Sequence, residues 1–186
     1  MGALASKLSA SDLRSILMEV YLARAARVKE ADIWAHAARD ALMAPSTVSA
    51  RDLILFDSVA FQAASGFGAL DLSPVCPFGA ASTLGGTSQN NVVTAIRNGE
   101  ALGDPTIALA LEAGRRRRAA DLVHLCASHR VIRLQPFDVP GYSPHFRLFG
   151  LVTAGRDTGS FRFETAHLLE LGRGNEEARL QGSACE

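Results

Sequence analysis

The chain has 186 residues, of which 48% are hydrophobic, 20% charged and 6% aromatic. This length and composition predict a soluble globular protein. They exclude an intrinsically disordered chain, because a sequence this apolar can bury enough surface to offset its conformational entropy. The 19 basic and 19 acidic residues cancel, so the net charge gives no argument for a nucleic acid, a membrane surface or an acidic ligand as partner.

The sequence shows no pattern typical of a secreted, membrane or metal-binding protein. Its cysteines, Cys76, Cys126 and Cys185, have wide and unrelated spacings, which argues against a disulfide framework and against a zinc site. The N-terminus lacks the apolar core of a signal peptide, and every apolar run ends well before the about 18 residues that span a bilayer. We therefore expect a cytoplasmic protein with no metal site and no membrane partner.

Residues 1–62 are expected to form a layer of helices. Apolar side chains recur at helical spacing in three successive stretches, residues 13–25, 29–42 and 53–61. The single tryptophan, Trp34, and Tyr21 lie on the apolar stripes of the first two stretches. Large aromatic side chains on such a stripe are most simply core residues, so we expect both to be buried within this layer.

Residues 66–171 are expected to contain the sheet. Glycine and proline divide this region into short segments, which favours loops and strands over long helices. The β-branched stretch 91–97 has the composition of a strand, and residues 131–134 and 145–153 are expected to pair as a hairpin with a long loop.

Together these segments predict an α+β fold, in which a helical N-terminal third precedes a mostly antiparallel sheet with flanking helices. A final helix is expected over residues 161–171. Residues 1–171 would then form a single domain, and the polar residues 172–186 a flexible tail.

A helix is predicted to start at Asp104, because aspartate caps helices and Pro105 suits the first helical position. Two interpretations of this start, which includes Thr106, remain open. The free N–H groups and positive end of a helix can bind a carboxylate or a phosphate. Capping by Asp104 explains the same residues without a ligand.

The two strands of the predicted hairpin carry arginines at positions that can share a face. Alternation places Arg133 on one face of the first strand, and Arg147 and Phe149 on one face of the second. Two guanidinium groups beside an aromatic ring would bind an anion and stack on a planar group if that face lines a cleft. The same side chains would form an ordinary solvated face if it does not.

The run of four arginines at residues 115–118 suggests a site for RNA. Consecutive helical residues point around the whole helix, however, and basic residues at a helix C-terminus also complement its dipole. The sequence contains no nucleophile elbow, phosphate-binding glycine loop or zinc-protease motif, so no nucleophile or metal-assisted reaction is predicted.

Three segments, considered in order, resemble the catalytic core of class II aminoacyl-tRNA synthetases. The likeness is to the histidyl-type enzyme and to its paralogue, the regulatory subunit of ATP phosphoribosyltransferase. The segments are LGDPTIALALEAGRRR at 102–117, SHRVIRLQ at 128–135 and HFRLF at 145–149. They resemble the family's turn and following helix, its arginine-bearing strand, and the strand with its Arg-x-Phe pattern.

The resemblance implies a role for each matching residue. Arg133 takes the place of the arginine that grips the α-phosphate and the amino-acid carboxylate, and Gln135 that of an acidic adenine contact. Arg147 and Phe149 match the Arg-x-Phe pattern, whose phenylalanine stacks on adenine. Thr106 would lie near the bound amino group. ATP or AMP is the nucleotide that the resemblance implies.

The sequence also departs from the family pattern. Gly103 stands where the family's turn has an arginine, and nothing after Leu171 supplies the motif whose arginine binds the γ-phosphate. These departures imply a divergent or truncated relative rather than a competent synthetase.

The leading hypothesis is that the protein binds a small anionic ligand, a nucleotide or an amino acid, with or without catalysis. Its predicted ligand-binding residues are Arg133, Gln135, Arg147, Phe149, Asp104 and Thr106. The first alternative is a non-catalytic assembly or regulatory subunit that forms a homo-oligomer. The second alternative is an RNA-binding protein that uses residues 115–118.

Overall fold

The computed structural model describes residues 2, 6–135 and 142–169. By their contacts these residues form two compact units, each built from separate stretches of the chain. The described residues within Met1–Thr47, Val75–Gly103 and Ile132–His145 belong to the first unit, and those within Val48–Pro74, Asp104–Val131 and Phe146–Glu186 belong to the second. The tail predicted at residues 172–186 lies outside the described residues.

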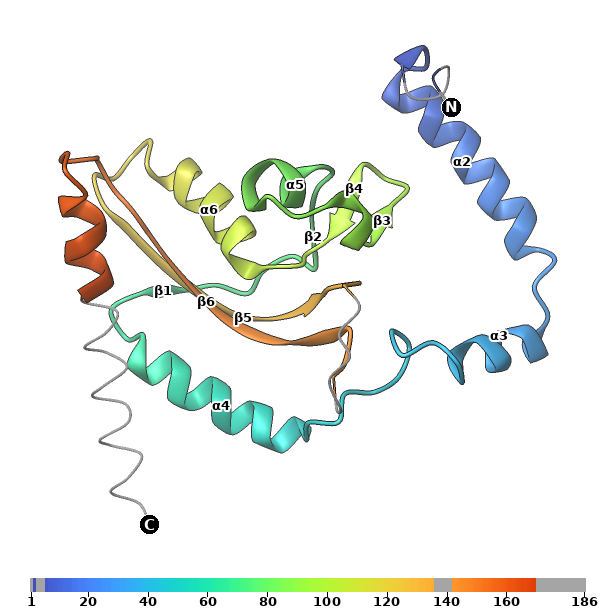
Figure 1. The fold of residues 1–186 in the computed structure, drawn as a ribbon, viewed down its shortest axis with the longest axis horizontal. Helices are drawn as coiled ribbons and strands as arrows, with labels where there is room; N and C mark the ends of the chain where they lie inside the picture. The colour runs from blue at the N-terminus through green and yellow to red at the C-terminus, as the bar shows by residue number, and fades with distance from the viewer. Residues whose placement is uncertain (1, 3–5, 136–141, 170–186) are drawn as a thin grey trace. The chain divides into compact units, whose positions relative to one another are not determined.

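The fold is α+β, as predicted, with helices flanking two small, mostly antiparallel sheets (Figure 1). The N-terminal third is helical and contains α2 (Ala10–Ala25), α3 (Glu30–Ala37) and α4 (Ala50–Ala63). Serine caps two of these helices: Ser9 accepts a hydrogen bond from the backbone of α2, and Ser49 does the same for α4.

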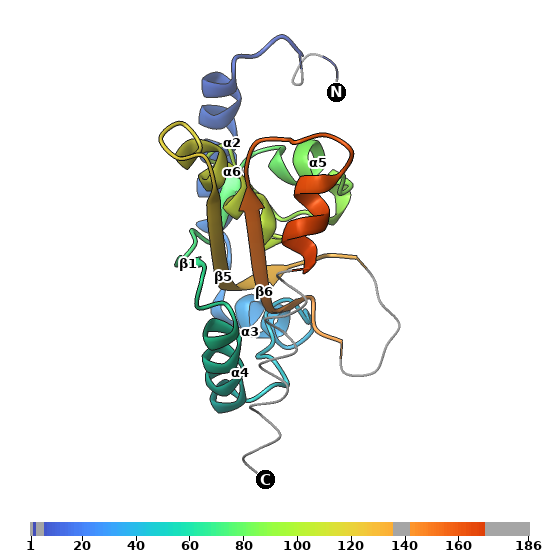
Figure 2. The same cartoon turned by 90° about the vertical axis from the view of Figure 1, so that its left-hand side faces the viewer.

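One sheet, most of which belongs to the second unit, has the strand order β1-β5-β6 (Figure 2). Its strands are β1 (Gly68–Ala69), β5 (Val123–Ile132) and β6 (His145–Ala154). β5 and β6 are neighbours, as the predicted hairpin requires. Two features were not predicted: β1 pairs with β5 in parallel, and β5 begins well before residue 131.

The core of the second unit lies between this sheet and α6 (Pro105–Arg116). Leu109 and Ala113 of α6 are buried against Leu125 and Ala127 of β5. Full burial of a leucine side chain contributes about 1.5–3 kcal/mol to stability. The burial of Leu109 and Leu125 therefore stabilises the packing of α6 on this face of the sheet. The predicted helix start is confirmed, because Asp104 caps α6 and its side chain accepts the N–H of Thr106 at 2.9 Å.

Other contacts complete the second unit. Gly150 of β6 lies directly under the start of α6: a Cβ atom at Gly150 would lie 2.9 Å from Pro105 Cγ and 3.3 Å from Leu109 Cδ1. Residues 162–169 are helical, in agreement with the predicted final helix, and pack through His167, whose ring centroid lies 5.5 Å from that of His124 on β5.

The first unit contains a second sheet, with the strand order β2-β4-β3, in which both pairings are antiparallel. Its strands are β2 (Val75–Pro77), β3 (Thr94–Ala95) and β4 (Gly99–Ala101). A short helix, α5 (Ala80–Gly85), and a 3-10 turn, η1 (Gln89–Asn91), connect β2 to β3. β4 is the central strand, so its side chains meet those of both neighbours.

The strand predicted at residues 91–97 is largely wrong. The 3-10 turn η1, in which Ser88 accepts the N–H of Asn90, extends to Asn91 and so includes the first residue of the predicted strand. Only Thr94–Ala95 is a strand, and a turn with a positive φ of 56° at Asn98 leads into β4. The turn at residues 96–98 therefore ends the strand after two residues, despite the β-branched composition of the stretch.

The expected burial of the N-terminal aromatic residues is also wrong. No residue of α2 or α3 is buried, and Trp34 and Tyr21 are 69% and 57% exposed. Trp34 instead donates its indole N–H to Glu30, one turn earlier in the same helix, at 3.3 Å. A helical stripe indicates which side chains share a face, but it does not supply a partner for that face.

The contact at Gly150 gives a test of the packing. The Gly150→Ala substitution places a methyl group against Pro105, and we expect the strain to lower the free energy of unfolding by about 1–3 kcal/mol. Gly114→Ala is the control, because a Cβ there meets nothing within 4 Å inside α6, and we expect it to stabilise by up to about 1 kcal/mol. Urea unfolding of both variants measures the difference, and equal effects would contradict this packing.

Candidate functional site

Arg133 follows β5 in the first unit and is half-buried. Its side-chain Nε donates a hydrogen bond to the carbonyl of Gly103 at 2.8 Å, and its backbone N–H donates to the carbonyl of Pro144 at 2.8 Å. The bond at Nε orients the guanidinium group, which is the group the sequence analysis assigned to anion binding. Gln135, two residues further, is also half-buried.

The backbone on both sides of Arg133 is held by the first unit. The N–H of Ile132 donates to the carbonyl of Leu102 at 3.2 Å, and the N–H of Leu134 donates to the carbonyl of Asn91 at 3.2 Å. Arg133 is therefore fixed between the residues that follow β4 and the last residue of η1.

Glu100 of β4 is the one charged or polar residue that is buried among the described residues, with 0% exposure. Its carboxylate accepts hydrogen bonds from the backbone N–H groups of Ala81 at 2.7 Å and Gly79 at 2.9 Å, and from the side-chain amide of Gln89 at 2.9 Å. The thiol of Cys76 is a fourth, weaker donor at 3.9 Å. This carboxylate therefore joins β4 to the start of α5, to η1 and to β2.

These contacts keep Glu100 ionised. Burial alone would raise the pKa of the carboxyl group, but the hydrogen bonds from Ala81, Gln89 and Gly79 lower it, and the net pKa lies below its ordinary value. Burial and the neighbouring Glu100 charge raise the pKa of the Cys76 thiol, so the thiol stays neutral beside the carboxylate. The pair thus carries a single negative charge.

Arg147 and Phe149 lie on the sheet face that α4 covers. Asp57 of α4 forms an ion pair with Arg147, whose Nη1 is 3.6 Å from Asp57 Oδ2, and also accepts the hydroxyl of Ser128. The Phe61 ring meets the Phe149 ring edge to face, with centroids 5.1 Å apart. Two of the side chains that were predicted to hold a ligand, Arg147 and Phe149, therefore also contact α4.

The predicted helix start lies on the opposite face of the same sheet. Gly150, which follows Phe149, faces Pro105 at the start of α6, and side chains alternate between faces along a strand. Asp104 accepts both the N–H and the hydroxyl of Thr106, so its carboxylate already occupies the helix N-terminus. The structure thus places Asp104 and Thr106 apart from Arg147 and Phe149, and does not bring these four residues into one pocket.

Two buried side-chain nitrogens in the second unit have no hydrogen-bond partner among the described residues. They are Nε2 of His129 on β5 and Nε of Arg147 on β6. Burial lowers the pKa of His129; the Asp71 charge opposes this effect and the Arg147 charge adds to it. The imidazole is therefore held neutral, and such groups are places where a water molecule or a ligand can supply the missing contact.

Three of the four arginines at residues 115–118 bond to neighbouring groups of the same stretch of chain. Arg115 and Arg116 both bond to Glu112, at 2.7 Å and 2.6 Å, and Arg117 donates to the carbonyl of Ala120. The hydrogen bonds from the two arginines lower the pKa of Glu112 to about 2. This carboxylate offsets part of the positive charge that an RNA would need.

Sequence reasoning gave no specific role to either of the two carboxylates that organise the units, Glu100 and Asp57. The sequence around each of them looks like that of an exposed acidic residue, because their partners are far away in the chain. Those of Glu100 lie within residues 76–89, and those of Asp57 are Ser128 and Arg147.

Among the described residues no group of three His, Cys, Asp or Glu side chains is placed to hold a metal ion. In the same part of the chain no helix is both long and apolar enough to cross a membrane.

Comparison by sequence finds no matching family model and no matching curated protein. Comparison by structure finds two structures of the pyrrolysyl-tRNA synthetase from Desulfitobacterium hafniense, with TM-scores of 0.56 and 0.55 and 15% identity. Each match covers 68% of this chain and 46% of the synthetase chain. A histidyl-tRNA synthetase from Nostoc sp. PCC 7120 has a TM-score of 0.49 and 18% identity, over 72% of this chain and 34% of its own.

The likeness to the pyrrolysyl enzyme confirms, for the fold, the predicted resemblance to class II synthetases. At 15% identity it is a likeness of fold alone. The chain spans about half the length of that enzyme, 46% of it.

The ionised state of Glu100 predicts an acid-sensitive stability. Because its pKa is lower folded than unfolded, its contribution is complete above the unfolded pKa and is lost as the pH falls through the folded pKa. We expect Glu100→Gln to lower the free energy of unfolding by about 1–3 kcal/mol at neutral pH, since two N–H donors lose a charged acceptor. Urea unfolding from about pH 6 to about pH 3 should show this difference narrowing; a constant difference would contradict the assignment.

Asp57 gives a second test, on the other unit. The Asp57→Ala substitution removes the acceptor of Ser128 and the partner of Arg147, and we expect it to lower the free energy of unfolding by about 1–3 kcal/mol. Asp52→Ala is the matched control, an exposed aspartate in the first turn of the same helix, with an expected loss of about 0.3–1 kcal/mol. If Asp57→Ala lowers the free energy of unfolding no more than Asp52→Ala does, the contacts of Asp57 with Ser128 and Arg147 do not stabilise the unit.

Proposed function

We propose that the protein binds a small anionic ligand, a nucleotide or an amino acid, with Arg133 as its main anion contact. One observation carries this proposal: the guanidinium group of Arg133 is held by a hydrogen bond to Gly103, in a chain whose fold is similar to that of a synthetase. A guanidinium fixed through its Nε loses little further freedom when it binds a phosphate or a carboxylate, which favours it as an anion contact.

Arg133 carries the proposal because the carbonyl of Gly103 holds its Nε in place. Asp57 pairs with Arg147, Phe61 packs against Phe149, and Asp104 caps its own helix. Gln135 is half-buried two residues from Arg133, and its side-chain amide can donate to or accept from a ligand. We therefore restrict the proposed site to Arg133 and Gln135.

Such a site acts by charge neutralisation and positioning. An arginine and an amide offer hydrogen bonds and positive charge, and neither is a nucleophile at neutral pH. Any reaction at this site would rest on holding the ligand and stabilising its charge.

The test is ligand binding by the purified chain and by two arginine variants. A ligand at about 100 times its dissociation constant should stabilise the protein by about 2.7 kcal/mol, seen as a rise in melting temperature with ATP, AMP or amino acids. We expect Arg133→Ala to weaken binding by tenfold or more, about 1.4 kcal/mol or greater, through the lost charged contact.

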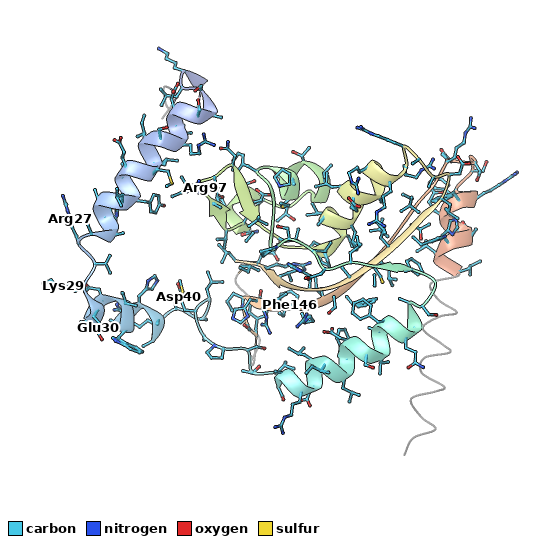
Figure 3. All side chains as sticks on the ribbon, turned by 180° about the vertical axis from the view of Figure 1, so that it is seen from behind. Arg27, Lys29, Glu30, Asp40, Arg97 and Phe146 are labelled. Carbon is cyan, nitrogen blue, oxygen red and sulfur yellow. The ribbon has the colours of Figure 1, made fainter. Side chains whose placement is uncertain are left out.

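Arg97→Ala is the control, because Arg97 is an exposed arginine of the same unit that extends from the turn between β3 and β4 (Figure 3). It should leave the affinity unchanged. Equal affinity of the Arg133→Ala variant and the wild type, or no ligand-induced shift in a cooperatively melting wild type, contradicts the proposal.

A second candidate function, assembly into a homo-oligomer, is favoured by the outer side of α4. Large apolar side chains remain exposed there: Leu55 (65%), Val59 (46%) and Phe56 (44%). The inner side of the same helix carries Asp57 and Phe61, which contact the sheet. A helix that is apolar on both sides is usually covered on both, so we propose that a second copy of the chain covers the outer side.

Light scattering on the purified chain tests this assembly. We expect an oligomer that dissociates in the Leu55→Glu variant, because a charge would be placed in an apolar interface. Ser58→Glu, at an exposed polar position of the same helix, is the matched control and should leave the mass unchanged. A monomeric wild type at micromolar concentration would contradict this second function.

A further inference from the structure

The buried carboxylate of Glu100 has no part in the proposed ligand site, yet it is the most completely buried charge in the described residues. We infer that Glu100 is a positioning residue, which holds the backbone that aims Arg133. The inference rests on the proposed function, since it gives Glu100 a role only through the anion contact of Arg133. It is carried by two independent chains of hydrogen bonds, both within the first unit.

The first chain passes through η1. Glu100 Oε2 accepts the amide of Gln89, the first residue of η1, at 2.9 Å. The last residue of the same turn, Asn91, offers its carbonyl to the N–H of Leu134 at 3.2 Å. Glu100 thus holds η1 in place, and η1 holds Leu134, the residue that follows Arg133.

The second chain passes along β4. The carboxylate anchors β4 to the start of α5 through Gly79 and Ala81. The two residues directly after β4 then hold the arginine: the carbonyl of Leu102 accepts the N–H of Ile132, and that of Gly103 accepts the Nε–H of Arg133. Glu100 is three residues before Gly103 in the sequence. A shift of β4 would therefore also move the Gly103 carbonyl, which accepts the Nε–H of Arg133.

A charged acceptor is needed at Glu100 because its position is surrounded by donors. Two backbone N–H groups and one amide converge on the two carboxylate oxygens, with the Cys76 thiol as a fourth donor. A glutamine of the same shape has only one acceptor oxygen, and its NH2 group faces a donor. Because a buried donor without an acceptor is unfavourable, the segments around the substituted residue move apart to find water.

The inference can be tested without a ligand, by NMR of the Arg133 side chain. The Nε–H signal of Arg133 is identified by its loss in Arg133→Lys, and its exchange with water reports the hydrogen bond to Gly103. We expect exchange at least about tenfold faster in Glu100→Gln, since both chains that hold Arg133 loosen. Glu112→Gln, which removes a carboxylate from α6, is the control and should leave the rate unchanged.

Gln89→Ala provides a second variant in case Glu100→Gln does not fold. It removes one donor of the first chain and leaves the carboxylate and β4 in place, so we expect faster exchange by a smaller factor. Unchanged Arg133 exchange in a folded Glu100→Gln variant, or in Gln89→Ala when Glu100→Gln fails to fold, overturns the inference.

Binding measurements separate this inference from the proposed function. If ATP, AMP or an amino acid binds the wild type, Glu100→Gln should weaken binding about tenfold, and Glu112→Gln should not. Equal affinity in Glu100→Gln overturns the positioning role. If none of these ligands binds the wild type, the proposed function fails, and the exchange rates alone decide whether Glu100 positions Arg133.

Discussion

The first unit depends on one constraint: a carboxylate is buried and must keep its charge. Moving an ion out of water is costly in free energy. Donors at the start of α5 and in η1 offset this cost for Glu100 by bonding to its carboxylate oxygens. The N–H of Ala81 is buried and would cost about 1–3 kcal/mol if left unpaired, so the carboxylate and this donor require one another. These bonds specify how β2, α5, η1 and β4 are arranged.

The second unit is organised differently, by a sheet with two unlike faces. The face toward α6 is apolar and closely packed, and only a glycine fits under Pro105. The face toward α4 combines an ion pair, a hydroxyl bond and an aromatic pair, all made with Asp57 or Phe61. Arg147 and Phe149, which were predicted to bind a ligand, thus also contribute to the packing of α4.

Local patterns predicted the local structure well. The cap and proline at Asp104 and Pro105 predicted α6, the apolar run near residue 55 predicted α4, and the alternation at 145–153 predicted β6. These signals need only neighbouring residues. The order of elements also led to the synthetase-like fold, which the structural comparison confirms.

Much of what the sequence did not predict depends on residues far apart in the chain. Asp57 meets Ser128 from 71 positions away, and Glu100 meets Ala81 from 19 positions away. Periodicity places Trp34 on a stripe without saying what covers the stripe, and it is exposed. For Arg133, sequence reasoning named the residue, but only the structure shows its Nε held by Gly103.

The most direct test of this account is the ionisation of Glu100 itself. A carbon-13 NMR titration of the glutamate side chains, with the Glu100 signal identified by its absence in Glu100→Gln, follows this group alone. The account predicts a carboxyl group that remains ionised to lower pH than the exposed glutamates, because backbone and amide donors hold its charge. A Glu100 carboxyl that takes up its proton at or above the pH of the exposed glutamates would contradict it.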